Sequence, residues 1–267
     1  MRVKWLEDIL GNEWKIKPAG GATGEAYYAQ SQNEKLFLKR NSSPFLAVLS
    51  AEGIVPKLVW TKRLENGDVV TAQRWLQGRE LKAAEMQQTK VAHLLSKIHR
   101  SSDLLNMLKR LGKQPMHPTM LCEHALHITS PYYTDPLLKA SVTFLSRNLP
   151  YVQSDEKVVC HGDVNHNNWL ISDEEELYLI DWEGAVVADP ALDLGMLLHW
   201  YVPRQHWTDW LDAYGIELTT TLEYRMKWYV VYQSSVSLAW HRMRQETREE
   251  NHWYHVLKTL LNQLNLL

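Results

Sequence analysis

The first eighty residues alternate short apolar and polar runs, the pattern of half-buried β-strands. EWKIKPAGGATGEAYYAQ (13–30) predicts a strand, a glycine-rich turn and a second strand, and LFLKR (36–40) predicts a third. KLVWTKRLENGDVVTAQRWL (57–76) holds two alternating runs about Asn66-Gly67, a dipeptide that accepts the positive φ of a hairpin turn. We expect these pieces to form one antiparallel sheet.

The hydrophobic period changes after residue 80. In KAAEMQQTKVAHLLSKIHRS (82–101) apolar side chains recur near every 3.6 residues, which predicts an amphipathic helix that His99 and Arg100 help to close. Glycine and proline residues then break the chain between 112 and 118. Residues 119–148 favour helix again, with interruptions at two prolines.

The second half of the chain begins with strands and ends with helices. KVVC (157–160) predicts a short buried strand, and NWLI and LYLID predict two strands flanking a hairpin around residue 174. From Pro190 the pattern is helical, with a long helix over 221–243. We expect an α+β fold with two lobes: an antiparallel β lobe of residues 1–78 and a mainly helical lobe of residues 79–267.

Composition excludes several classes of function. The chain carries 29 Lys and Arg against 31 Asp and Glu, so its net charge provides no strong field for direct binding to nucleic acid or an anionic membrane. No apolar run approaches the roughly 18 residues of a membrane span, and MRVKWLEDIL is too charged for a signal peptide. Cys122 and Cys160 lack CxxC spacing. We expect a cytoplasmic protein with reduced thiols, not an integral membrane protein.

The candidate chemistry lies in HGDVNHNNW (161–169) and in the strand LYLID that follows it. Phosphoryl transfer needs a carboxylate that accepts the proton of the attacking hydroxyl, and Asp163 suits this role. It also needs a cation on the phosphates, and Asn168 and Asp181 offer the hard oxygen ligands that Mg²⁺ prefers. We interpret His161 as a residue that orients the loop.

These segments resemble the catalytic and metal-binding segments of the aminoglycoside phosphotransferase and choline kinase family, with HGD and IDW standing where protein kinases carry HRD and DFG. The resemblance implies a bilobal protein-kinase-like fold that uses ATP and Mg²⁺. PAGGATGEAYY resembles the loop that covers the nucleotide, and AQRWLQGREL resembles the hinge that contacts adenine. The implied nucleotide-binding residues are Gly20, Gly21, Thr23, Gly24, Lys39, Gln73, Arg74 and Trp75.

One segment departs from this family. Related kinases pair the strand lysine with a glutamate on the next helix, whereas NSSPFLAVLSAEGIVP is short and its only acid, Glu52, is close to its end. The sequence therefore leaves open whether Lys39 has an acidic partner, and nucleotide positioning is expected to use other contacts instead of a pair with Glu52. The short helix and HGDVNHNNWL most resemble the CcrZ/YtmP type of phosphotransferase of bacilli and streptococci. That branch implies a pentose-type hydroxyl substrate and a cell-division or replication protein as partner.

The acceptor substrate is a small molecule with a hydroxyl group, expected between the catalytic loop and the C-terminal helices. The candidate contacts are His166, Glu183, Asp193 and Trp200, with further aromatic rings at Trp182, Tyr201 and Trp228. Asp193 and Asp189 are also placed to brace the loop. The choice between a ribose or deoxyribose sugar and an amino alcohol of choline or thiamine type stays open.

Two other classes of protein remain as alternatives. A metal-dependent hydrolase would use His161, Asp163, His166 and Asp181 as ligands around an activated water. A kinase-like interaction protein with weak activity would bind a partner through its aromatic C-terminal helices. Against both, Asp163, Asn168 and Asp181 occur in the order that nucleotide chemistry requires, together with an upstream glycine-rich loop and Lys39.

Overall fold

The computed structural model of the chain describes residues 4–20 and 25–266. Its contacts divide the chain into two compact units. The first unit consists of residues 1–82 and 166–183, and the second consists of 83–165 and 184–267. The segment 166–183 therefore belongs with the N-terminal residues although it lies late in the sequence. The functional lobes expected at 1–78 and 79–267 stay a prediction.

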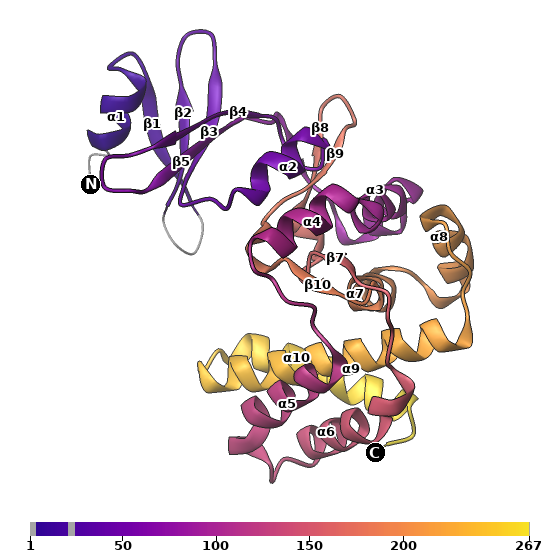
Figure 1. Cartoon of the computed structure of the whole chain (residues 1–267). Helices are drawn as coiled ribbons and strands as arrows, with labels where there is room; N and C mark the ends of the chain where they lie inside the picture. The colour runs from indigo at the N-terminus through magenta and orange to yellow at the C-terminus, as the bar shows by residue number, and fades with distance from the viewer. Residues whose placement is uncertain (1–3, 21–24, 267) are drawn as a thin grey trace. The chain divides into compact units, whose positions relative to one another are not determined.

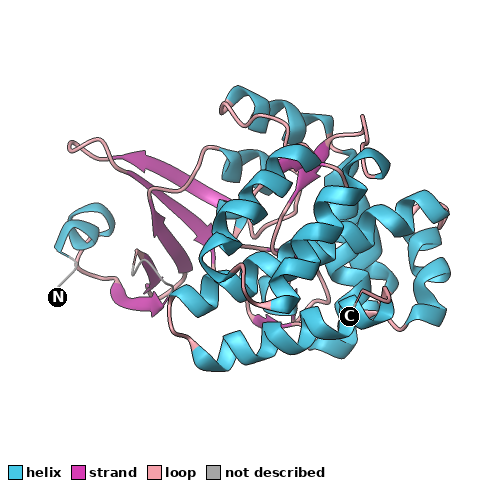
Figure 2. Ribbon diagram, turned by 90° about the horizontal axis from the view of Figure 1, so that it is seen from below, coloured by secondary structure: helices cyan, strands magenta, loops and turns pink. Residues whose placement is uncertain are grey.

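The first unit contains an antiparallel sheet of five strands, in the order β1-β2-β3-β5-β4 (Figures 1 and 2). The strands are β1 (Lys15–Gly20), β2 (Ala26–Gln30), β3 (Lys35–Arg40), β4 (Leu58–Arg63) and β5 (Val69–Arg74). Gly67, in the predicted turn between β4 and β5, has a φ of 91°. The prediction of one antiparallel sheet is confirmed.

One face of this sheet forms a core with helix α1 (Lys4–Leu10). Alternate positions of β3 and β5 are buried in it, as the strand period of two residues requires. The buried core consists of Leu6, Ala29, Leu36, Leu38, Val70 and Ala72. Because Leu36 and Leu38 lie on the same face, Lys39 in the same strand points to the other face.

The first unit also contains a small sheet of three antiparallel strands, in the order β6-β8-β9. These are β6 (Gly78–Glu80), β8 (Trp169–Ser172) and β9 (Leu177–Leu179), and helix α2 (Phe45–Ala51) lies between β3 and β4 in the chain. β8 and β9 form the hairpin predicted around residue 174. A Cβ atom at Gly78 would lie 2.1 Å from the carbonyl oxygen of Ile171, so β6 can pair with β8 at this position only as glycine.

Helices form most of the second unit. They are η1 (Ala83–Gln87), α3 (Thr89–Arg100), α4 (Ser102–Arg110), α5 (Pro118–Thr129), η2 (Ser130–Tyr132), α6 (Pro136–Asn148), η3 (Leu149–Tyr151), α7 (Ala191–Tyr201), η6 (Arg204–His206), α8 (Trp207–Tyr214), α9 (Thr220–Met243) and α10 (Thr247–Gln263). The single helix predicted over 82–101 is divided, because Gln88 adopts an extended conformation between η1 and α3. The mainly helical C-terminal region is confirmed.

Helix α9 is the centre of this unit, and α5, α6, α7 and α10 all pack against it (Figure 1). It begins where the Thr219 hydroxyl accepts the N–H of Leu222 at 3.1 Å, which caps the helix. Trp228 of α9 is completely buried and donates its indole N–H to the carbonyl oxygen of Leu145 at 3.0 Å. Trp228 is therefore part of the packed core and not a surface for a ligand.

None of the helices in the described ranges, 4–20 and 25–266, combines the length and the apolar character needed to cross a membrane.

Candidate active site

The HGD segment begins where a buried strand ends. Strand β7 (Val158–Cys160) pairs antiparallel with β10 (Val186–Ala188), and all three residues of β7 are buried. Gly162 follows with a φ of 81°, in the left-handed region, and a Cβ atom there would lie 3.3 Å from the carbonyl oxygen of Gly184. This position therefore favours glycine for both its backbone conformation and its close neighbour.

The side chain of Asp193 binds the backbone of the HGD loop. Asp193 lies in the first turn of α7, has no exposed surface, and accepts the backbone N–H of His161 at 2.7 Å and that of Gly162 at 2.9 Å. Charge-assisted hydrogen bonds of this kind are stronger than neutral ones. The arrangement favours the bracing role of Asp193 over contact with a substrate.

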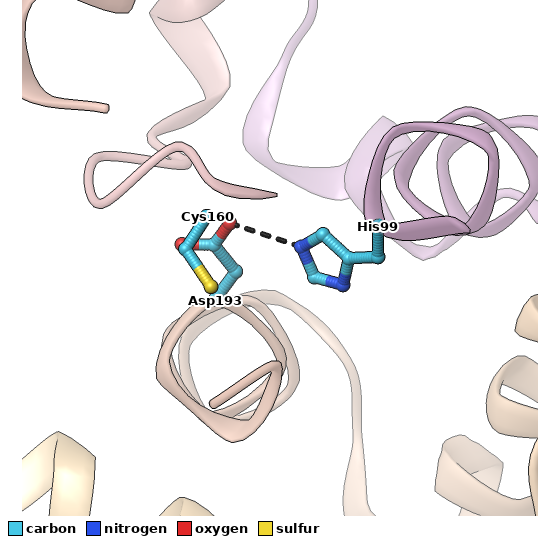
Figure 3. Close-up of side chains that lie close together, drawn as sticks. All are labelled: His99, Cys160 and Asp193. Atoms are coloured by element: carbon cyan, nitrogen blue, oxygen red, sulfur yellow. Dashed lines mark hydrogen bonds and ion pairs between the residues drawn. The ribbon is translucent and has the colours of Figure 1, made fainter. Parts of the chain in front are cut away.

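A third donor to Asp193 comes from α3. His99 Nε2 lies 3.2 Å from Asp193 Oδ2 (Figure 3). Its Nδ1 lies 2.6 Å from the hydroxyl of Tyr214. Burial by itself would raise the pKa of Asp193, but the hydrogen bonds from His99 and Gly162 stabilise the carboxylate, so its pKa lies below the usual value. Sequence reasoning missed this contact, because His99 showed only as a residue at a helix end.

His99, Cys160 and Asp193 are residue types that can bind a metal ion, but the state of their ligand atoms does not favour a metal site. Ligand atoms of His99, Cys160 and Asp193 all lie within 4.8 Å of one another (Figure 3). Both oxygens of Asp193 already accept hydrogen bonds, and burial raises the pKa of the Cys160 thiol, so the thiolate that binds metals is disfavoured. We therefore interpret these side chains as a hydrogen-bonded support for the loop.

The reactive carboxylate predicted at Asp163 is exposed on this supported loop. The backbone N–H of Asp163 donates to Nδ1 of His161 at 3.2 Å, and the His161 side chain is completely buried. Asp163 Oδ1 also accepts a hydrogen bond from Nδ2 of Asn165. The imidazole thus lies where an orienting residue is required, and the roles of His161 and Asp163 stay predictions.

The two predicted metal ligands lie beside the ends of two neighbouring strands of the first unit. Asn168 ends η4 (His166–Asn168) just before β8, and its carbonyl oxygen accepts the N–H of Ile180 at 2.8 Å, which extends the β8–β9 ladder by one residue. Asp181 follows directly and has a φ of 67°, an unusual backbone conformation that aspartate tolerates better than most residues. The hairpin therefore brings the backbone positions of Asn168 and Asp181 together.

Lys39 joins this acidic end of the hairpin. Its ammonium forms an ion pair with Glu183, in η5 (Trp182–Gly184), and lies 4.0 Å from Oδ1 of Asp181. Lys39 therefore has an acidic partner in a residue that sequence reasoning assigned to the substrate. Glu52, at the position expected for that partner, is the C-cap residue of α2.

The remaining residues predicted to bind the nucleotide belong to the glycine-rich loop and to the hinge. Gly20 ends β1, whereas Gly21, Thr23 and Gly24 lie outside the described residues. At the predicted hinge, Gln73 Nε2 donates to the carbonyl oxygen of Pro56 at 2.8 Å.

Both hinge amides already have acceptors, since Arg74 N donates to Lys57 O at 2.8 Å and Trp75 N donates to Lys35 O at 3.0 Å. An adenine contact would fall to the carbonyl oxygens of this segment or to the residues that follow it.

The predicted substrate residues are also distributed between the two units. His166 begins η4 in the first unit, and Trp200 lies in α7 of the second. The Trp200 ring is half-buried, with its centroid 5.3 Å from that of Trp253 in an edge-to-face contact. Trp200 and Trp253 therefore form a small aromatic group that belongs to α7 and α10.

Solved structures of phosphotransferases share this fold. Choline kinase LicA from Streptococcus pneumoniae is 18% identical, with 96% of this chain and 97% of that chain covered and a TM-score of 0.68. A spectinomycin phosphotransferase in complex with ADP and spectinomycin is 16% identical, with coverages of 95% and 93% and a TM-score of 0.66. A macrolide 2'-phosphotransferase type I is 14% identical, with coverages of 91% and 90% and a TM-score of 0.60. At these identities the likeness shows the fold, and the predicted kinase-like α+β fold is confirmed.

Sequence comparison gives the family. Residues 15–229 match the phosphotransferase enzyme family, a range that runs from the first residue of β1 into α9 and includes the loop, the hairpin and Lys39. The predicted family resemblance and the prediction of a phosphotransferase are thereby confirmed. Since the match covers most of the sequence, this chain belongs to the phosphotransferase enzyme family.

Proposed function

We propose that this protein is an ATP- and Mg²⁺-dependent kinase that transfers the γ-phosphoryl group to a hydroxyl group of a small molecule. The observation that carries the proposal is Asp163, an exposed carboxylate on a loop whose neighbouring backbone amides are bound by Asp193. A general base for a hydroxyl must be reachable by solvent or substrate and held in one place. Asp163 has both properties.

The residues at the end of the β8–β9 hairpin fit a hard divalent cation. Asp181 and Glu183 bring two carboxylates against the single ammonium of Lys39, and Asp181 is more than half exposed at 56%. Carboxylate and amide oxygens are the donors that Mg²⁺ accepts. Asn168 and Asp181 would hold this ion, which neutralises charge on the β- and γ-phosphates when bound.

Lys39 and Asp163 would have separate roles in the reaction. Lys39 would bind the α- and β-phosphates, and its ion pair with Glu183 fixes the ammonium in place before nucleotide arrives. Asp163 would orient the acceptor hydroxyl and take its proton as the oxygen attacks the γ-phosphorus and ADP leaves. The phosphoryl group passes directly to the acceptor, so the reaction needs no covalent enzyme intermediate.

The test is transfer of phosphate from ATP to a mixed panel of pentoses, nucleosides, amino alcohols and aminoglycosides. We expect one class to be phosphorylated, and Asp163→Asn to lower turnover by about 10²- to 10⁴-fold while ATP binding is retained. Asp173→Asn, at an exposed aspartate of the β8–β9 turn, is the matched control and should leave turnover unchanged. The proposal fails if no acceptor is phosphorylated and calorimetry detects no bound nucleotide.

For the acceptor, we propose a ribose- or deoxyribose-type sugar. This choice is supported by the resemblance of HGDVNHNNWL and of the seven-residue helix α2 to the CcrZ/YtmP type, which also motivates a cell-division or replication protein as partner and a cytoplasmic location. Phosphorylation of pentoses in preference to amino alcohols supports the proposal. A preference for amino alcohols would overturn it.

An amino alcohol of choline or thiamine type is the second candidate. It is favoured by the half-buried ring of Trp200 beside Trp253, because aromatic faces attract quaternary ammonium groups. Trp200→Leu would then raise the KM for choline and leave the KM for ATP unchanged. The match to the phosphotransferase enzyme family does not support the alternative of a metal-dependent hydrolase. A kinase-like interaction protein would bind nucleotide without measurable transfer to any acceptor in the panel.

A further inference from the structure

Helix α7 contacts the catalytic loop at both of its ends. In the first turn, Asp193 accepts the N–H groups of His161 and Gly162 at 2.7 and 2.9 Å. At the last residue, the hydroxyl of Tyr201 donates to Oδ1 of Asn165 at 3.3 Å. The two contact points enclose Asp163 in the sequence of the loop.

The polarity of the hydrogen bonds through Asn165 is fixed by chemistry. An ionised carboxylate can only accept, so the amide group that faces Asp163 must be Nδ2, and the structure shows Nδ2 donating to Asp163 Oδ1. The amide oxygen then faces away and requires a donor, which the hydroxyl of Tyr201 supplies. Without that donor, the amide oxygen would lose this partner, and the hydrogen bond to Asp163 would have to hold the amide without it.

Helix α7 is a rigid support for the loop, because one continuous helix carries both contacts and packs closely against α9. Tyr201 lies eight positions after Asp193, which corresponds to about 12 Å along a helix. The helix is also fixed against α9, since a Cβ atom at Gly195 would lie only 2.8 Å from the carbonyl oxygen of Met226. A rigid element that binds a loop on both sides of one residue restricts the orientation of that residue.

We propose that Tyr201 is a positioning residue for phosphoryl transfer, which acts through Asn165 to orient the carboxylate of Asp163. The inference rests on the proposed function, because it assigns Tyr201 to a reaction in which Asp163 is the base. Asn165 transmits the orientation and Tyr201 fixes it.

Kinetics of Tyr201→Phe test the proposal. Loss of one hydrogen bond should lower kcat by roughly 5- to 30-fold, which corresponds to about 1 to 2 kcal/mol. The KM for ATP should not change. Asn165→Ala should lower kcat by a similar factor, and adding Tyr201→Phe to it should have no further effect, because both substitutions break the same chain of hydrogen bonds.

Tyr224→Phe is the matched control. Tyr224 of α9 also donates its hydroxyl to an asparagine Oδ1, that of Asn148 at the end of α6, and it has no contact with the loop among the hydrogen bonds described. This variant should keep the kcat of the wild type. Equal losses of kcat in Tyr224→Phe and Tyr201→Phe would show a general effect of losing a hydroxyl and would overturn the proposal.

A second measurement does not depend on turnover. The side-chain amide resonances of Asn165, observed by ¹⁵N–¹H NMR, should shift in Tyr201→Phe and in Asp163→Asn and should stay in place in Tyr224→Phe. Resonances that do not respond to Tyr201→Phe would overturn the inference. An active wild type with an unchanged kcat in Tyr201→Phe would refute the inference alone, whereas a wild type that phosphorylates no acceptor would refute the proposed function.

Discussion

His199, near the end of α7, should make the protein sensitive to mild acid. Its Nδ1 lies 2.9 Å from the carbonyl oxygen of Gly195, and its ring centroid lies 4.6 Å from that of Trp207. Burial lowers the pKa of His199 from 6.5 to about 4. The hydrogen bond to Gly195 and the charge of Glu223 act against this decrease, and the charge of Lys227 adds to it.

The sign of the effect follows from proton binding. Between pH 6.5 and about 4 the unfolded chain binds a proton at this histidine and the folded chain does not, so the free energy of unfolding decreases as the pH falls. Each pKa unit corresponds to about 1.4 kcal/mol, so the full shift is worth about 3 kcal/mol. Stability that is fully present at pH 7 is thus lost toward pH 4.

Urea denaturation of the wild type and His199→Leu at pH 7.5, 6.5, 5.5 and 4.5 measures this contribution. At pH 7.5 the variant should be less stable by about 1 kcal/mol, because it lacks the hydrogen bond. At pH 4.5 it should be the more stable protein, since it has no imidazole to charge. His93→Leu, at an exposed position of α3, is the control and should give a curve parallel to that of the wild type. Parallel curves for His199→Leu would refute the reasoning.

Two further predictions concern the contacts that hold α7 and α9. Arg225→Met leaves the buried carboxylate of Asp189 without the guanidinium 3.1 Å away, and should lower the free energy of unfolding by about 3 kcal/mol. Burial raises the pKa of Asp189, so denaturation at pH 5 and pH 8 should show a smaller loss at pH 5, where the carboxyl takes up a proton more readily; a larger loss at pH 5 would contradict this. Gly195→Ala places a methyl group 2.8 Å from Met226 O and should lower the Tm by about 3 to 8 °C in calorimetry, and an unchanged Tm would show that α7 moves freely on α9.

Local sequence pattern gave reliable predictions for elements whose period is uninterrupted. The strands from 15 to 74 and the long helix α9 follow alternation or a helical period over enough residues that no other element fits. The pattern over 82–101 was less informative. A 3.6-residue period persists across Gln88, whose extended backbone divides η1 from α3, because periodicity reports the buried face and not the continuity of hydrogen bonds.

The sequence predicts which residues belong to the candidate site better than it predicts their contacts. Glu183 follows Asp181 closely in the chain, and the sequence predicts it as a substrate contact, yet it pairs with Lys39 from β3. The sequence also offers Trp228 as an aromatic substrate contact, whereas its side chain is completely buried in the core. Both outcomes depend on which segments fold against each other, and a side chain's neighbours in space cannot be read from its own stretch of sequence.

The sequence by itself determined the class of the protein. The order of Lys39, Asp163, Asn168 and Asp181 resembles that of the aminoglycoside phosphotransferase and choline kinase family, and the strand and helix periods predict an α+β fold. This was possible because strand and helix periods are local and because phosphoryl transfer needs a small set of oxygen and nitrogen groups in a fixed order.

Only the tertiary structure decided how the loop is supported. Asp193 binds backbone amides 31 and 32 residues earlier in the chain, and His99 reaches Asp193 across 94 residues. Tyr201 binds Asn165 from 36 residues away. Such contacts form because the packing of α3, α7 and β7 brings distant donors to buried acceptors that would otherwise be left unpaired. No local pattern records that packing, so the residues proposed to orient Asp163 become visible only in the folded chain.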